Sequence, residues 1–150
     1  MKTRVIFVCV HNSARSQMAA AFLKIQGGPR FEVESAGIEA GILNPLVVRA
    51  MAERGIDISG NTTQKAQDLA DRGERFDYIV TVCDQAAAER CPYFPGKGIR
   101  LHWSFPDPSE LEGSDEDKLA AIRIIRDGIE AKVIAWLGEL QGEEGGGSWI

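Results

Sequence analysis

The sequence predicts a single α/β domain in which a four-stranded parallel sheet carries helices on both faces, as a three-layer sandwich. Apolar, β-branched runs alternate along the chain with segments of helical spacing, which is typical of parallel strands joined by crossover helices. The length of 150 residues is enough for one domain, and no internal repeat indicates a second. We place the domain at residues 1–141 and expect residues 142–150, which include three consecutive glycines, to form a flexible tail.

The first predicted strand is the clearest, because residues 5–8 are apolar and mostly β-branched, as expected of a strand buried on both faces. Behind it, Met18, Phe22 and Ile25 fall on one face of a helix that a pair of glycines ends. Residues 30–37 alternate between apolar and polar side chains, which predicts a strand nearer the sheet edge. The remaining predicted elements are a helix at 45–54 capped by Asn44, a short helix at 64–72, a buried strand at 76–83, a short helix within 84–98, a strand at 99–103, and a long helix to Leu140 behind a capping box of Ser114 and Asp117.

The balance of charged residues restricts the partners. With 17 Lys and Arg against 22 Asp and Glu, the net charge is −5, which argues against nucleic acid or an anionic membrane as the main partner. No apolar run reaches the length of a membrane span, and the apolar stretch after the basic residues 2–4 is too short for a signal peptide. We therefore expect a cytoplasmic monomer whose thiols are kept reduced.

Cysteine usage indicates chemistry rather than a disulfide framework. The chain has three cysteines, Cys9, Cys83 and Cys91, and an odd number in a reducing compartment suggests reactive thiols, a metal site or simply buried thiols. Because no Cys-x-x-Cys pair occurs and there are only two histidines, we expect neither a metal site nor a bound cofactor.

The junction after the first strand has the composition of an oxyanion site. Cys9 ends the strand just before a helix, so backbone N–H groups and the helix dipole would attract an anion and favour a thiolate. Arg15 adds a planar fork of donors that suits a tetrahedral oxyanion, and Ser16 can donate a hydrogen bond to the sulfur. A structural cysteine beside a surface arginine is the alternative, but the spacing on this junction favours a site. The predicted anion-binding residues are Val10, His11, Asn12, Ser13, Ala14, Arg15 and Ser16.

Two other cysteines and one carboxylate are further candidates. Right-handed crossovers place the ends of the first and third strands at the same sheet edge, so Cys83 is expected near Cys9. Cys91 falls in a segment with proline and glycine that could move, and Asp107 precedes a proline in a turn, where a protonated carboxyl could donate to a leaving group. Taken singly, each residue also fits a purely structural role: Cys83 as a core residue, Cys91 as a loop cysteine and Asp107 as a turn residue.

Residues 9–19 resemble the phosphate-loop signature of the low-molecular-weight protein tyrosine phosphatases, and still more that of the arsenate reductases built on the same fold. Gln17 and Met18 favour the reductases, because the phosphatases usually have proline there. The resemblance runs in order from about residue 4 to about residue 140 and implies the low-molecular-weight phosphatase-like fold. The other matching segments are residues 35–40, 44–45, 55–59, 80–83, 91–92, 102–105 and 107–108.

The resemblance to the thioredoxin-coupled arsenate reductases implies a role for each candidate residue. Cys9 attacks arsenate held by the loop and Arg15, and Asp107 protonates the departing oxygen. Cys83 then attacks Cys9 and releases arsenite, and Cys91 moves the disulfide to the Cys83–Cys91 pair, which thioredoxin reduces. Glutaredoxin with glutathione is the alternative reductant, and phosphate and sulfate are the competing oxyanions.

Two other functions compete with arsenate reduction. A low-molecular-weight protein tyrosine phosphatase, acting through a cysteinyl-phosphate, would use Cys9, Arg15 and Asp107 but would give Cys83 and Cys91 no role. A non-enzymatic oxyanion sensor or redox-responsive protein would need no complete set of nucleophile, arginine and acid.

The chain departs from the family pattern at several positions. His11 stands where relatives often have glycine, and seven residues separate Cys83 from Cys91 where many relatives have six. Some relatives bind a monovalent cation behind the loop with Asn, Glu, Ser and Asp. The matching residues here are Asn12, Ala20, Ser35 and Gln64, so both acids are missing and we expect no potassium dependence.

Overall fold

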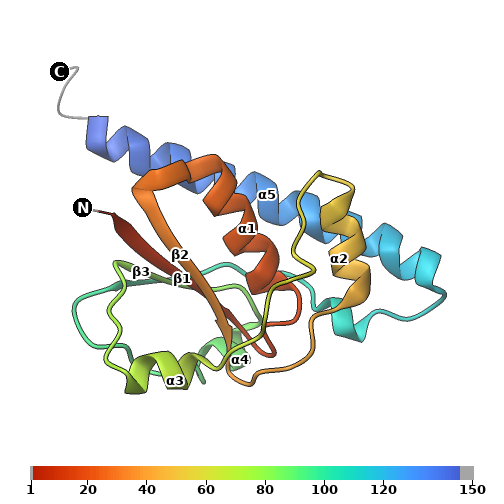
Figure 1. The fold of residues 1–150 in the computed structure, drawn as a ribbon, viewed down its shortest axis with the longest axis horizontal. Helices are drawn as coiled ribbons and strands as arrows, with labels where there is room; N and C mark the ends of the chain where they lie inside the picture. The colour runs from red at the N-terminus through yellow and green to blue at the C-terminus, as the bar shows by residue number, and fades with distance from the viewer. Residues whose placement is uncertain (1, 146–150) are drawn as a thin grey trace.

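The fold, seen in a computed structural model that describes residues 2–145, is built around a parallel sheet of four strands (Figure 1). The strand order is β2-β1-β3-β4, so the strand expected nearer the edge does lie there. All pairings are parallel, with Val5 of β1 opposite Val33 of β2 and Tyr78 of β3. The strands are β1 (Thr3–Cys9), β2 (Phe31–Gly37), β3 (Tyr78–Thr81) and β4 (Ile99–His102).

Helices cover both faces of the sheet, as the sequence predicts. Helices α1, α2 and α5 pack with one face in a large apolar cluster, and α3 packs on the opposite face in a smaller one (Figure 1). The helices are α1 (Arg15–Gly27), α2 (Pro45–Ala52), α3 (Ala66–Asp71), α4 (Gln85–Ala88) and α5 (Asp115–Gly145), with single 3₁₀ turns at Gly28–Arg30 and Pro108–Glu110.

The central strand β1 is buried on both faces. Val5 and Phe7 face the large cluster, whereas Ile6 and Val8 face the small one, and all four have no exposed surface. Each of these side chains contributes about 1.5–3 kcal/mol by burial. Because β1 is fixed on both sides, the position of Cys9 at its end is fixed as well.

One core prediction is wrong. Ile25 was expected beside Met18 and Phe22, but its side chain is 58% exposed. After Leu23, residues 24–26 of α1 are exposed, and the chain returns to the core at Gly27 before it enters β2.

Helix α5 begins at the predicted capping box. The Ser114 hydroxyl accepts a hydrogen bond from Asp117 N at 3.2 Å, and the Asp117 carboxylate accepts one from Ser114 N at 3.3 Å. The helix continues to Gly145 and so includes the first four residues of the segment predicted as a tail, while the rest of that segment, residues 146–150, lies outside the described residues. Within the described part of the chain, no helix is long and apolar enough to cross a membrane.

Candidate active site

The loop between β1 and α1 is held from its outer side. The carbonyl oxygens of Cys9, Val10 and His11 accept hydrogen bonds of 2.8–2.9 Å from the backbone N–H groups of residues 38, 39 and 41, and Ser13 O accepts one from Asn44 N. Among the described residues, none accepts a hydrogen bond from the N–H groups of residues 10–14. These N–H groups, next to the start of α1, are therefore the donors that an anion would find.

Asn12 sets the shape of this loop. It has a φ of 55° and is fully buried, and asparagine tolerates this left-handed conformation better than most residues. Its side-chain amide donates to Ser16 Oγ at 2.7 Å and to Ser35 Oγ at 3.0 Å, and its Oδ1 accepts from Gln64 N at 3.0 Å. Gly37 allows the close approach of β2, because a Cβ there would lie 2.7 Å from Asn12 N.

Cys9 lies at the base of the loop with its sulfur supported by a hydroxyl. The residue is 2% exposed, and its Sγ is 2.9 Å from Ser16 Oγ. Because Ser16 Oγ already accepts a hydrogen bond from the Asn12 amide, its own proton is available for the sulfur. A donor on the sulfur, together with the helix start, stabilises a thiolate.

Arg15 and Asp107 meet above the loop. The Arg15 side chain is 4% exposed, donates from Nη1 to Phe105 O at 3.0 Å, and places Nη2 3.5 Å from Asp107 Oδ2. The other carboxylate oxygen, Asp107 Oδ1, accepts from Ser109 N at 2.9 Å and Ser109 Oγ at 2.8 Å. One oxygen of Asp107 is thus fixed by the turn, and the other is directed at Arg15.

The three cysteines are free thiols in different surroundings. Cys83 is fully buried in the same apolar cluster as Cys9. Burial raises the pKa of the Cys83 thiol to about 11, and the charge of Arg15 opposes that increase. Cys91 packs in the smaller cluster, beside Phe94, and burial raises the pKa of its thiol too. The structure thus places Cys83 in the same apolar cluster as Cys9 and Cys91 in the cluster on the opposite face.

A family model described as low molecular weight phosphotyrosine protein phosphatase matches residues 4–145. The chain belongs to this family. Among curated members, it is 44% identical over 133 residues to an arsenate reductase of Halalkalibacterium halodurans, covering 88% of this chain and 93% of that protein. It is 43% identical over 132 residues to an arsenate reductase of Bacillus subtilis, covering 86% and 91%.

Solved structures of family members have the same fold. An arsenate reductase in the phosphate binding state superposes with a TM-score of 0.74 at 29% identity and covers 93% of this chain and 98% of its own. A thioredoxin-dependent arsenate reductase of Corynebacterium glutamicum has a TM-score of 0.68 at 30% identity, covering 93% and 62%. The tyrosine phosphatase Wzb of Escherichia coli K30, in complex with sulphate, has a TM-score of 0.72 at 21% identity, which shows the shared fold.

Both histidines of the chain have side chains that reach the solvent. His11 is directed outward, with its side chain 43% exposed and Nδ1 3.5 Å from Glu39 Oε2. His102 is exposed and places Nδ1 2.7 Å from Thr81 Oγ1, whereas the neighbouring Trp103 is buried.

Gln17, which the sequence indicated only as a point of resemblance to the reductases, supports the oxyanion loop in the structure. It is 2% exposed, and its amide donates to Asn12 O at 3.1 Å and to Thr62 O at 3.2 Å while accepting from Asn61 Nδ2 at 3.0 Å. Gln17 therefore links the oxyanion loop at Asn12 to the segment that contains Thr62. The signal that could have found it is an amide side chain on a helix face otherwise made of apolar residues.

Three of the four residues that match the cation ligands of some relatives, namely Asn12, Ser35 and Gln64, hydrogen-bond to one another. Gln64 Nε2 donates to Ser35 O at 2.9 Å and to Glu34 Oε2 at 3.0 Å, next to Asn12. Hydrogen bonds from Gln64 thus already occupy the Asn12 and Ser35 oxygens that could coordinate a cation. The described residues contain no group of three or more His, Cys, Asp or Glu side chains that could hold a metal ion.

The absence of potassium dependence stays a prediction with a direct test. Titrating phosphate by calorimetry in potassium chloride and in choline chloride of equal ionic strength should give the same dissociation constant, because amide hydrogens already serve the loop oxygens. Tighter binding in potassium would contradict this expectation.

Replacing Gln17 by methionine should loosen the loop. The change keeps the shape but leaves Asn12 O and Thr62 O without a donor, so we expect the free energy of unfolding to fall by about 1–3 kcal/mol and phosphate to bind more weakly. Urea unfolding and calorimetry measure the two effects. The matched control is Gln26→Met on the exposed last turn of α1, and equal urea midpoints for the two variants would contradict the assignment.

The raised pKa of Cys83 predicts a pH dependence of stability. In the unfolded chain the thiol ionises near its ordinary pKa of 9.0, but in the fold it ionises near a pKa of 11. The folded state is therefore favoured by the neutral thiol below pH 9 and loses about 1–3 kcal/mol of this advantage between pH 9 and 11. Relative to Cys83→Ala, the wild type should lose stability over this range in urea titrations. A constant difference between the two proteins would show that the thiol pKa is not raised.

Proposed function

We propose that this protein reduces arsenate to arsenite through a disulfide relay of Cys9, Cys83 and Cys91, with thioredoxin as the reductant. The observation that carries the proposal is the burial of a second free thiol, Cys83, in the same cluster as the supported thiol at the base of the oxyanion loop. The curated arsenate reductases related to this chain support the same activity.

The first step places arsenate in the loop. The N–H groups of residues 10–14 and the guanidinium of Arg15 hold its oxygens, and Cys9 as thiolate attacks arsenic. Asp107 in its protonated form gives its proton to the departing oxygen, which leaves as water. The Oδ2 atom faces Arg15, so the acid lies on the side from which the guanidinium reaches the oxyanion.

The second step is the redox step. Cys83 attacks the sulfur of Cys9, a Cys9–Cys83 disulfide forms, and the electron pair of the sulfur–arsenic bond passes to arsenic, which leaves as arsenite. The thiolate is the nucleophile, so Cys83 must first lose its proton. Arg15, whose charge lowers the pKa of Cys83 against the effect of burial, favours that loss.

The third step requires the chain between the two remaining cysteines to move. Cys91 lies in the opposite cluster, and between it and Cys83 the chain forms only the four-residue helix α4, capped by Asp84 through a 2.8 Å hydrogen bond to Ala87 N. So short a helix has little stability of its own. Its unwinding lets Cys91 attack Cys83, which frees Cys9 and presents the Cys83–Cys91 disulfide to thioredoxin.

Phosphoester hydrolysis is the second candidate. The family description and the shared Cys9, Arg15 and Asp107 support a cysteinyl-phosphate intermediate. This activity leaves both Cys83 and Cys91 unused, so we place it second. We further propose that the domain of residues 1–141 works as a monomer in the cytoplasm. Thioredoxin is the reductant there, and glutaredoxin with glutathione is the alternative reductant.

Arsenate-dependent oxidation of NADPH in the presence of thioredoxin and thioredoxin reductase tests the proposal. The wild type should turn over, while Cys83→Ser and Cys91→Ser should each lose activity roughly hundredfold or more, because each removes a step of the relay. After one turnover, Cys91→Ser should hold the Cys9–Cys83 disulfide, detectable by mass spectrometry.

Two controls make the outcome decisive. Parallel assays with glutaredoxin and glutathione identify the reductant, and hydrolysis of p-nitrophenyl phosphate measures the competing activity. No arsenate-dependent turnover with either reductant would overturn arsenate reduction. Full turnover in both serine variants would leave the enzyme but remove the relay.

A further inference from the structure

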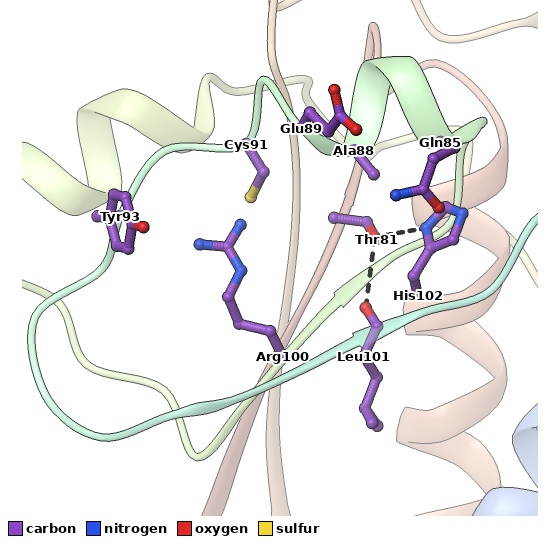
Figure 2. A pocket seen from close by; sticks show the side chains of 9 residues that line it. All are labelled: Thr81, Gln85, Ala88, Glu89, Cys91, Tyr93, Arg100, Leu101 and His102. Atoms are coloured by element: carbon purple, nitrogen blue, oxygen red, sulfur yellow. Dashed lines mark hydrogen bonds between the residues drawn. The ribbon is translucent and has the colours of Figure 1, made fainter.

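A cavity of about 310 Å³ lies beside Cys91, apart from the oxyanion loop. It opens between the edge strand β4 and the segment that contains α4 and Cys91 (Figure 2). The lining residues from the two sides include Gln85, Cys91, Tyr93, Arg100 and His102. The mechanism above uses Cys91 but assigns nothing to the residues around it.

Arg100 and Cys91 face each other across this cavity. The Cys91 sulfur and the Arg100 guanidinium are directed toward one another (Figure 2). The guanidinium carbon of Arg100 also lies 5.6 Å from the centroid of the Tyr93 ring, a cation–π contact that holds the side chain on that side of the cavity. Burial raises the pKa of the Cys91 thiol, and the positive charge of Arg100 acts against that increase. The thiol itself donates a hydrogen bond of 3.7 Å to Pro92 O.

We propose that Arg100 is a positioning residue of the relay, which favours the loss of the Cys91 proton when Cys83 has entered a disulfide. The proposal rests on the proposed function, because only the relay gives Cys91 a nucleophilic role. A buried thiol without such a cation would lose its proton less readily and would be a slower nucleophile.

Arg100 assists the transfer of the disulfide from the Cys9–Cys83 pair to the Cys83–Cys91 pair, which needs no further oxidant or reductant. The Cys91 thiol loses its proton to solvent through the open cavity. Its thiolate attacks Cys83 Sγ, a Cys83–Cys91 bond forms, and the Cys9–Cys83 bond breaks with its electron pair on Cys9. The oxyanion loop and Ser16 then stabilise the Cys9 thiolate for the next arsenate.

A purely structural role for Arg100 makes a different prediction. β4 is an edge strand with Ile99 53% exposed, and charged side chains on such strands oppose edge-to-edge association. Removing the charge would then affect solubility but would not change the titration of a thiol on the neighbouring segment.

The test measures how fast iodoacetamide alkylates Cys91 between pH 6 and pH 11 in the intact three-cysteine protein. Trypsin cleaves after Arg90 and Lys97, so Cys91 is the single cysteine of its peptide and is quantified by mass spectrometry. Arg100→Gln should move the midpoint of alkylation up by about 0.5–1 pH unit and slow alkylation at pH 7 roughly threefold to tenfold. A change in solvent access alone would alter the rate at every pH and leave the midpoint unchanged.

Two further variants serve as controls for Arg100→Gln. Arg100→Lys keeps the charge and should restore much of the wild-type midpoint. Lys97→Gln removes the same charge from the same segment but does not line the cavity, so its midpoint should equal that of the wild type. Equal midpoints for Arg100→Gln and Lys97→Gln would overturn the proposal.

A single turnover with arsenate measures the relay itself. After acid quenching and trapping of free thiols, Arg100→Gln should accumulate the Cys9–Cys83 disulfide, whereas the wild type should proceed to Cys83–Cys91. Equal progress in both would overturn the role of Arg100. If even the wild type forms neither disulfide, the proposed function fails, and alkylation still decides whether Arg100 stabilises the Cys91 thiolate.

Discussion

The outward hydrogen bonding of the loop carbonyls is the constraint on which the rest of the site depends. The segment of residues 38–44 takes up the carbonyl oxygens, which leaves the N–H groups of the loop for an anion. This arrangement needs Asn12 in a left-handed conformation and a residue without a side chain at Gly37. The same Asn12 amide that fixes the loop also orients Ser16 toward Cys9, so oxyanion binding and thiolate stabilisation share one set of hydrogen bonds.

Burial separates the roles of the thiols. Cys9 is nearly as buried as Cys83, but it has a hydroxyl on its sulfur and a helix start beside it. Cys83 has apolar surroundings, which raise its pKa and keep it a neutral thiol at neutral pH. A neutral thiol does not compete with Cys9 for the oxyanion. The order in which the cysteines act is thus consistent with their surroundings before any substrate binds.

Much of the fold followed from the sequence because its signals are local. The buried strand β1, the Asn44 cap and the capping box of α5 each depend on residues a few positions apart, and each is present. The roles of Gln17 and Arg100 could not be predicted in this way. Gln17 bonds to residues 61 and 62, more than 40 positions away, and the neighbours of Arg100 depend on the path of an irregular segment.

The extent of motion that the relay needs is limited by two anchors. Cys83 lies two residues beyond the buried end of β3 at Thr81 and is itself fully buried. Phe94 packs edge to face on Phe76 at 5.3 Å, which holds the chain to the small cluster beyond Cys91. Residues 84–93 between these anchors contain one four-residue helix and the 88% exposed Tyr93. Moving Cys91 therefore costs one short helix and the burial of two small side chains, Ala87 and Cys91, and requires no change in the sheet or the oxyanion loop. The third thiol can thus lie in the opposite core because the segment that carries it is held by one short helix and few buried side chains.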